Sequence, residues 1–239
     1  MDVNEHQELS DIKKFYDSVY YKDKTTDTSE NRHYQNLATK LGINTETEIL
    51  DVACGSGEWL LACSQRGAKI AGIDLSEKAI DICRSTFKNG EFLAQAAENL
   101  PFRTDQFNIV SCLGSLEHFV DPVKALKEMR RVASQDAQFV VLVPNADFLT
   151  RKLKLFRGTY QVDAKEHVRT LPAWNDLFTE AGLTVTDRWK DLHIVSIKWV
   201  KLGPWYAWPF RALQAILLTI WPLKWQYQVY HLCHNTNNH

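Results

Sequence analysis

A glycine turn that directly follows a short apolar run restricts the fold of this chain more than any other feature. Residues 48–53 (Glu-Ile-Leu-Asp-Val-Ala) have the nearly continuous apolar character of a buried strand, and residues 54–57 (Cys-Gly-Ser-Gly) follow at once. A helical pattern through Trp59 and Leu60 comes next. In an open α/β sheet, such a turn lies beyond the carboxyl end of a strand, where glycine lets the backbone approach a ligand. The sequence therefore predicts a ligand-binding strand–turn–helix unit.

Strands and helices continue to alternate after this unit. Ser76 is a good N-cap for one helix, and Asp121 with Pro122 predicts the start of another that runs to about Val132. Further strands are expected at residues 69–74, 92–94, 107–112 and 138–143. Because these strands are almost wholly apolar and alternate with helices, we predict a doubly wound, Rossmann-like α/β sheet covered by helices on both faces.

The 239 residues fit a single domain with three parts. We expect a helical cap over residues 1–45, because residues 9–21 and 30–41 each suit a helix with one buried stripe. A cofactor-binding core follows at 46–144. The substrate-side half, 145–239, contains a helix at 171–181 that Gly182 ends, strands at 183–189 and 226–233, and an apolar helical insertion between these two strands.

The spacing within the glycine turn argues against phosphate ligands. A dinucleotide site takes G-x-G-x-x-G, and the position of its third glycine is Leu60 here. No Gly-Lys-Ser/Thr follows the turn, which excludes a P-loop. The turn therefore suits a nucleoside without phosphates, and Asp74, at the end of the next strand, is placed to accept hydrogen bonds from both ribose hydroxyls.

Four segments in order resemble one known family. They are residues 51–57 (Asp-Val-Ala-Cys-Gly-Ser-Gly), 72–76 (Gly-Ile-Asp-Leu-Ser), 97–102 (Ala-Glu-Asn-Leu-Pro-Phe) and 115–122 (Ser-Leu-Glu-His-Phe-Val-Asp-Pro). The chain resembles the class I S-adenosylmethionine-dependent methyltransferases, in the broad subgroup that includes the ubiquinone and menaquinone biosynthesis methyltransferases. The resemblance implies a parallel sheet with an antiparallel last strand, S-adenosylmethionine as cofactor, and methyl transfer as the reaction.

The resemblance also implies a role for individual residues. The methionine part of the donor would lie against the first turn, at Asp51, Ala53, Cys54, Gly55, Ser56 and Gly57. Asp74 and Leu75 would hold ribose and adenine, Ala97 and Glu98 would flank the adenine, and the sulfonium end would lie near Leu113, Gly114 and His118. The family often has an acid in place of Ala96 and an Asp in place of Asn108. Adenine recognition would then rest on backbone groups and neighbours of Ala96, and the effect at Asn108 would be structural only.

His118 is the candidate catalytic residue. Methyl transfer from a sulfonium is an in-line displacement, so the enzyme chiefly aligns the reactants and excludes water, and a base is needed only for an acceptor such as a hydroxyl. His118 follows the fourth strand at the ligand edge and is either that base or a residue that caps a helix or shapes the donor site. His167 and His193 are weaker candidates.

The last part of the chain has a composition of its own. From Leu192 to the end there is no Asp or Glu, and five of the eight tryptophans lie within 199–225. This region, with the basic stretch at 151–157, is interpreted either as a peripheral membrane contact that serves a lipid acceptor or as an insertion that covers the sheet or forms a homodimer. It is too short and too polar for a transmembrane helix.

Composition limits the partners and the compartment. The formal net charge of -1 and the lack of a basic stripe argue against nucleic acid as a partner. Five widely spaced cysteines and a polar N-terminal segment lead us to expect a cytoplasmic protein without disulfides. We expect no metal site, since His231, Cys233 and His234 on a terminal strand are more often incidental.

The function that these patterns favour is methyl transfer to a small-molecule or lipid-like acceptor. Two alternatives stay open: a non-catalytic interaction protein that keeps the methyltransferase fold, and, less favoured, a nicotinamide-dependent oxidoreductase. The sequence does not identify the acceptor, nor whether oxygen, nitrogen or carbon is methylated.

Overall fold

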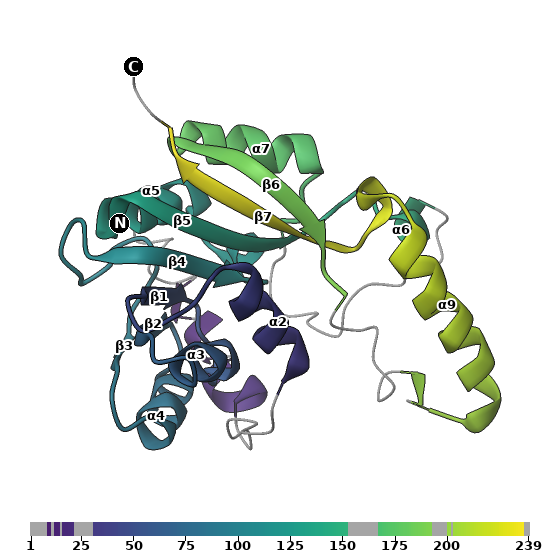
Figure 1. Cartoon of the computed structure of the whole chain (residues 1–239), viewed down its shortest axis with the longest axis horizontal. Helices are drawn as coiled ribbons and strands as arrows, with labels where there is room; N and C mark the ends of the chain where they lie inside the picture. Colours follow the sequence, from purple (N-terminus) through teal and green to yellow (C-terminus); the bar gives the residue numbers. More distant parts are fainter. Residues whose placement is uncertain are drawn as a thin grey trace.

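A seven-stranded sheet forms the centre of the molecule (Figure 1). The structure is a computed structural model that describes residues 9–10, 12–14, 16–21, 31–152, 167–192, 200–201 and 203–236. The strand order is β3-β2-β1-β4-β5-β7-β6. The strands are β1 (Glu48–Val52), β2 (Lys69–Asp74), β3 (Glu91–Ala94), β4 (Phe107–Leu113), β5 (Ala133–Pro144), β6 (Leu183–Lys190) and β7 (Gln228–Asn235).

The strand directions confirm the predicted topology. Strands β1 to β5 pair in parallel, whereas β7 runs antiparallel to both of its neighbours, β5 and β6. Strand β6 therefore points the same way as the parallel strands. The carboxyl ends of β1 to β6 consequently lie at one edge of the sheet, which is the edge where ligands bind in open α/β folds.

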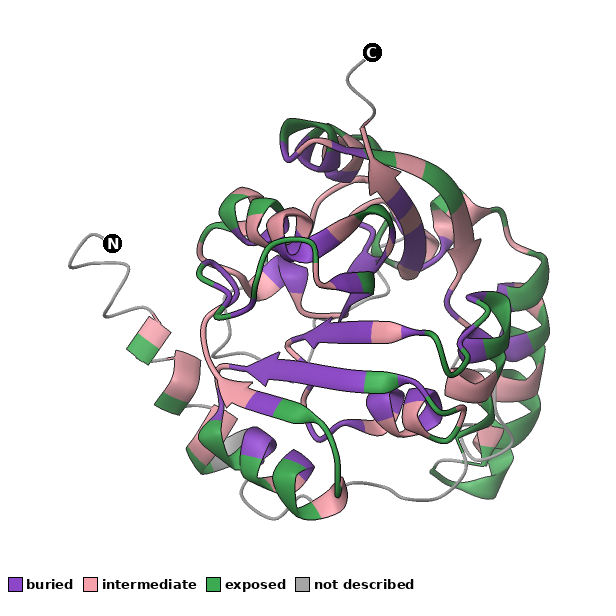
Figure 2. Ribbon diagram, turned by 60° about the vertical axis from the view of Figure 1, so that its left-hand side comes forward, coloured by how far each residue is buried: buried purple, intermediate pink, exposed green. Residues whose placement is uncertain are grey.

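Helices cover both faces of the sheet, as the apolar strands predicted (Figures 1 and 2). One face packs against α5 (Pro122–Val132) and α7 (Leu171–Glu180), and the other against α2 (Arg32–Lys40), α3 (Glu58–Ser64) and α4 (Glu77–Thr86). Successive strand residues alternate between these two cores: Leu50 belongs to the first and Ile49 to the second. Such two-sided burial explains why the strands are apolar throughout.

Local signals in the sequence set the helix boundaries. The Ser76 hydroxyl accepts a hydrogen bond from the Ala79 N–H at 3.2 Å and caps α4. The Asp121 carboxylate accepts one from the Lys124 N–H at 2.9 Å, and Pro122 opens α5. Gly182, with φ of +82°, follows α7. These caps satisfy backbone groups that a helix end leaves without partners.

Two details differ from expectation. The strand expected at residues 138–143 begins earlier, because α5 passes directly into β5 and Ala133 already pairs with Phe107 before the register shifts. The last strand begins at Gln228 rather than at residue 226. As expected, Asn108 has a structural part: its side chain accepts from the Glu48 N–H and donates to the Glu46 carbonyl, both at 3.0 Å, at the edge opposite the ligand edge.

The remaining elements are short apart from α9 (Trp208–Ile220), which lies between β6 and β7 in the sequence. They are the π-helical turn η1 (Tyr16–Tyr20), the 3-10 turns η2 (Leu116–His118), η3 (Trp205–Ala207) and η4 (Leu223–Trp225), and α6 (Leu149–Lys152). None of the helices in the described part of the chain has the length and apolarity needed to cross a membrane. His193, Trp199 and residues 153–157 of the basic stretch lie outside the described residues.

Candidate functional site

Two adjoining cavities lie beyond the carboxyl ends of the parallel strands. The first extends along the ends of β2 and β3, and the second along the ends of β1 and β4. Residues that line both cavities are Tyr16, Tyr21, Ala53, Ser115 and His118. The sequence-predicted site residues Asp51, Ala53, Cys54, Gly55, Asp74, Leu75, Ala97, Glu98, Leu113, Gly114 and His118 all line one or both of them. Ser56 and Gly57 belong to the same turn without lining either.

The glycine turn forms the floor between the two cavities. Ala53, Gly55 and Gly57 all have positive φ, at 61°, 56° and 85°. A Cβ on Gly55 would come within 2.9 Å of the Tyr21 hydroxyl oxygen, so this position tolerates only glycine without a shift of its neighbour. The turn thus brings bare backbone close to the place where a ligand would lie.

The Asp74 carboxylate is fixed by the backbone. Its Oδ2 accepts a hydrogen bond from the Gly55 N–H, and its Oδ1 accepts one from the Ser76 N–H, both at 2.9 Å. Burial raises the pKa of Asp74 to about 6, although these two hydrogen bonds act in the opposite direction. The carboxylate lines the first cavity in a fixed orientation, which suits the recognition of a pair of hydroxyl groups.

A second buried carboxylate, Asp51, lies under the second cavity. The Ser111 hydroxyl donates to its Oδ1 at 2.6 Å, and the Trp59 indole N–H donates to the Ser111 oxygen at 3.0 Å. Burial, together with the nearby charges of Asp74 and Glu58, raises the pKa of Asp51 to about 7, while the Ser111 hydrogen bond opposes the shift. A cationic group in this cavity would offset much of the burial cost.

Residues after β3 and η2 form the walls of the first cavity. The lining residues after β3 are Gln95, Ala96, Ala97 and Glu98, and those after η2 are Phe119 and Val120. The Glu98 Oε1 accepts from the Asp121 N–H at 3.3 Å, which ties this wall to the start of α5. Ala96, at the position where the family often has an acid, lines the first cavity. Its neighbour Gln95, which has an amide side chain, lines the same cavity.

The three histidine candidates differ in their position. His118 ends η2 and lines both cavities, beside Gly114 in the second. His167 lies close by, because its N–H donates to the Glu117 carbonyl at 2.9 Å, but it lines neither cavity. His118 is therefore the only one of the two described candidates that faces the ligand space.

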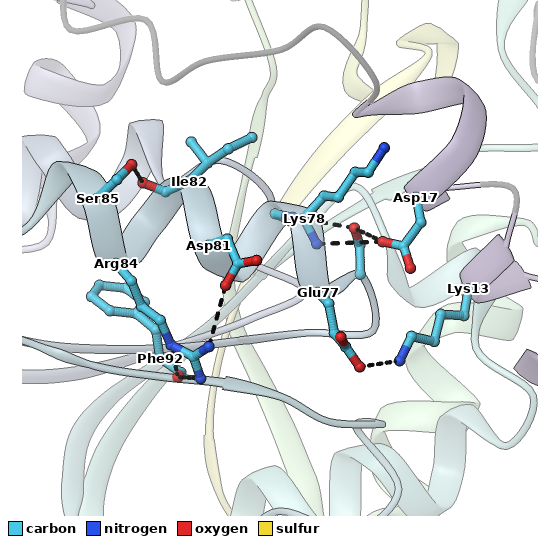
Figure 3. A network of polar contacts seen from close by, with 11 residues as sticks. Lys13, Asp17, Glu77, Lys78, Asp81, Ile82, Arg84, Ser85 and Phe92 are labelled. Atoms are coloured by element: carbon cyan, nitrogen blue, oxygen red, sulfur yellow. Dashed lines mark hydrogen bonds and ion pairs between the residues drawn. The ribbon is translucent and has the colours of Figure 1, made fainter.

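The N-terminal segment covers the first cavity. Leu9, Ile12 and Tyr16 line it, and Figure 3 shows how the segment is held against α4. The Lys13 ammonium lies 2.6 Å from a carboxylate oxygen of Glu77, and the Ser76 hydroxyl donates to Asp17 at 2.5 Å. These contacts hold the segment whose apolar side chains line the cavity.

The charges around both cavities have one sign. Their lining includes four carboxylates, Asp51, Glu58, Asp74 and Glu98, and among the described lining residues neither Lys nor Arg occurs. Such a site repels the pyrophosphate of a dinucleotide and attracts a ligand that carries a sulfonium and an ammonium group. S-adenosylmethionine has both of these cations and no phosphate, so the lining fits it.

Several lining residues were not singled out by the sequence. Tyr16, Tyr21, Tyr34, Trp59 and Gln95 line the cavities, and Ser111 lies beneath them. The tyrosines belong to the segments expected as a helical cap, so the only available signal was their aromatic type within those segments. Trp59 and Ser111 belong to no motif that the sequence analysis used for the site. Their role depends on a hydrogen bond between positions 52 residues apart, which a local pattern does not reveal.

A comparison with protein families identifies the class. A family model described as a methyltransferase domain matches residues 26–188, which is more than half of the chain. The chain belongs to this family. The matched residues include the glycine turn and the strands whose ends form the two cavities. Membership of the family identifies S-adenosylmethionine as the cofactor, in agreement with the acidic lining of the site. Family membership and the site's charge together count against the nicotinamide-dependent alternative.

Known relatives carry methyltransferase names. The chain is 30% identical over 173 residues to the methyltransferase YcgJ of Bacillus subtilis, which covers 66% of each chain. It is 30% identical over 162 residues to the ubiquinone biosynthesis O-methyltransferase of Pseudomonas aeruginosa, covering 59% of this chain and 66% of that one. The matched segment is thus just under two thirds of the length of either relative.

A solved structure shares the fold. The 1,6-didemethyltoxoflavin-N1-methyltransferase of Burkholderia thailandensis, solved with 1,6-didemethyltoxoflavin and S-adenosylhomocysteine bound, has a TM-score of 0.65 to this chain at 14% identity. The match covers 97% of this chain and 90% of that one. The predicted class I, Rossmann-like architecture is therefore confirmed.

Proposed function

We propose that this chain transfers the methyl group of S-adenosylmethionine to a small aromatic acceptor. The observation that carries the donor assignment is the pair of cavities with four carboxylates and neither Lys nor Arg in the described lining. The acceptor assignment draws on the aromatic side chains of the second cavity, Tyr34 and Trp59 beside Tyr16 and Tyr21, and on a relative named for ubiquinone biosynthesis. Aromatic rings stack favourably on such side chains.

Each end of the donor would meet a different set of residues. Asp74 would accept hydrogen bonds from the ribose hydroxyls, Ala97 and Glu98 would lie along the adenine, and Asp51 with Gly55 would face the methionine part. The bound cofactor supplies an electrophilic methyl group on a positively charged sulfur. What the protein adds is alignment of an acceptor with that methyl group and exclusion of water, to which the apolar side chains of Leu9 and Ile12 contribute.

We assign the base to His118, for an acceptor that is a hydroxyl. Its place at the junction of the two cavities supports this role, since the acceptor must reach the same point as the methyl group. The imidazole would take the hydroxyl proton while the oxygen attacks the methyl carbon and the sulfur leaves with the bonding electrons. General-base assistance of this kind contributes about a hundredfold to ten-thousandfold in rate.

Replacement of His118 tests the assignment. For His118→Ala we expect turnover to fall by about a hundredfold or more at unchanged affinity for adenosylhomocysteine. His167→Ala is the matched control, because His167 is a neighbour that lines neither cavity. Turnover of His118→Ala within a few-fold of wild type would assign this residue a structural part.

The acceptor class is tested with methyl-labelled donor and the purified chain. Aqueous and lipid fractions of a cell extract are supplied separately, and the release of adenosylhomocysteine is followed with each. We expect label in an aromatic product of the lipid fraction. Release with the aqueous fraction alone would point to a polar acceptor, and donor binding without release in either fraction would favour the non-catalytic interaction protein.

A further inference from the structure

Helix α9 and the turn η3 before it carry large apolar side chains on their outer surface. Trp205 is 74% exposed, Phe210 76%, Ile216 60% and Ile220 69%, and Leu213 is also more than half exposed. All the large hydrophobic side chains of the described residues that are exposed to this degree lie between positions 205 and 220. Single exposed apolar residues need no explanation, but a contiguous group of this kind marks an interaction surface.

The exposed side chains lie on one face of a helix whose other face is anchored. Positions 213, 216 and 220 follow a helical spacing and point to one side, whereas Ala215 and Leu218 are buried. The Gln226 amide donates to the Leu218 carbonyl and the Lys190 ammonium to the Thr219 carbonyl, both at 2.7 Å. The helix is thus held to the protein along its inner side, and its apolar side faces outward.

The charge of this surface has a single sign. From Leu192 to His239 the sequence has no Asp or Glu, while Lys201 precedes η3, Arg211 lies in α9 and Lys224 lies in η4. The Lys201 ammonium lies 5.8 Å from the Trp208 ring centre and the Lys224 ammonium 5.9 Å from that of Trp225. Basic side chains beside Trp and Tyr, with aliphatic residues between, are the composition of protein segments at anionic membrane interfaces.

The topology places this surface at the same edge of the sheet as the site. Strand β6 ends at Lys190 and β7 begins at Gln228, and both ends lie at the edge where the two cavities lie. In Figure 1, α9 stands beside the sheet rather than over either of its faces. A surface bound to α9 would therefore lie near the edge of the sheet that holds the two cavities.

We propose that the aromatic face of η3 and α9 (205–220) docks on an anionic lipid bilayer and lies in its interface. Helix α9 has 13 residues and would lie in the membrane plane, with Phe210, Leu213 and Ile216 among the acyl chains and lysines at the headgroups. A second copy of the chain fits less well. A two-fold contact places the same surface on both sides, so basic groups would meet basic groups with no acid of this segment between them.

Cosedimentation of the full chain with vesicles tests the proposal. We expect binding to phosphatidylcholine vesicles that contain phosphatidylglycerol, weaker binding to phosphatidylcholine alone, and a loss of the difference in high salt. The triple variant Phe210→Ser, Ile216→Ser, Ile220→Ser should bind at least about tenfold more weakly, since three apolar anchors are removed. Gln214→Ser is the matched control, an exposed polar position of the same helix. Lys201→Gln with Lys224→Gln should lower only the preference for anionic vesicles, by about fivefold per charge.

Two results would overturn the proposal. One is a wild-type chain that remains in the supernatant with both kinds of vesicle, and the other is a triple variant that binds as tightly as wild type. A dimer in sedimentation velocity that the triple variant dissociates, without vesicle binding, would assign the face to a second copy. Because sedimentation does not depend on turnover, these outcomes are independent of the methyl acceptor and of the base.

Discussion

Two buried carboxylates define the site at the scale of single residues. Asp51 and Asp74 are 3% and 8% exposed, and burial raises the pKa of both. Burying a carboxylate without an opposite charge costs free energy, so these residues lower the stability of the ligand-free protein, and a bound cation would offset that cost. A donor with an ammonium and a sulfonium group would supply that charge near Asp51, whose pKa the nearby Asp74 also raises.

Donor affinity should therefore depend on pH through Asp51. Its pKa of about 7 in the ligand-free protein means that the carboxyl is largely protonated at pH 5, and it must lose this proton to pair with an ammonium group. We expect the affinity for adenosylhomocysteine to rise with pH from 5 to about 7, by up to about tenfold per pH unit, and then to level off. Titration calorimetry across this range measures the slope.

Two variants distinguish the titration of Asp51 from a general effect of removing a carboxylate. Asp51→Asn should bind the ligand more weakly above pH 7 and lose the slope between about pH 6 and 7, because its side chain does not titrate. A slope below about pH 6 should remain, since burial also raises the pKa of Asp74 to about 6. Asp176→Asn, at an exposed position of α7, should keep both the wild-type affinity and the slope. An unchanged slope in Asp51→Asn would mean that another group controls the binding.

At the scale of elements, the site depends on how closely the glycine turn approaches the N-terminal segment. Gly55 has φ of +56°, and its α-hydrogen faces the Tyr21 hydroxyl. Tyr21 is buried and belongs to the stretch that follows η1, so the turn after β1 and the start of the chain must fit together. Both residues line the second cavity, so this contact joins two elements of its lining.

Gly55→Ala should damage this fit in a way that a second substitution partly repairs. The added Cβ costs about 1 kcal/mol in backbone strain and pushes the Tyr21 ring toward the ligand space, so we expect donor affinity to fall at least about tenfold. Tyr21→Phe removes the hydroxyl that the Cβ would meet, and the double variant should regain part of the loss. A double-variant cycle by calorimetry measures the coupling, and additive effects would contradict a direct contact.

The element boundaries show what the sequence could predict. Strands β1 and β2 and the starts of α4 and α5 follow from apolar runs and caps, which act locally. The early start of β5 was missed because Ser134, Gln135 and Asp136 are polar and are not fully buried. Their extended conformation follows from the backbone pairing of Ala133 with Phe107, which depends on β4 and not on local side chains.

At the scale of the whole molecule, the fold was predictable and the closure of the site was not. The doubly wound sheet and most ligand-edge residues follow from motifs and strand order. The contacts that orient them join distant positions: Trp59 to Ser111 and then to Asp51, and Asp17 to Ser76. No periodicity or motif reports a contact of this range, because it exists only after the sheet has formed.

Occupancy of the site should stabilise the whole molecule. A ligand at a hundred times its Kd adds about 2.7 kcal/mol to the free energy of unfolding. For a domain of this size we expect adenosylhomocysteine to raise the melting temperature by about 5 to 10 °C. NAD, with its two phosphates, should leave it unchanged because of the carboxylates around both cavities. An equal shift with NAD in a thermal unfolding assay would contradict the proposed charge selectivity.

Titration calorimetry of Asp74→Asn with adenosylhomocysteine tests most directly whether Asp74 holds the ribose of S-adenosylmethionine. The loss of charge-assisted hydrogen bonds should weaken binding by about tenfold to a hundredfold. Asp81→Asn is the matched control, because Asp81 lies on the exposed side of α4 in a surface ion pair with Arg84 and should keep the wild-type affinity. If Asp74→Asn binds as tightly as wild type, the donor lies elsewhere and the site proposed here is wrong.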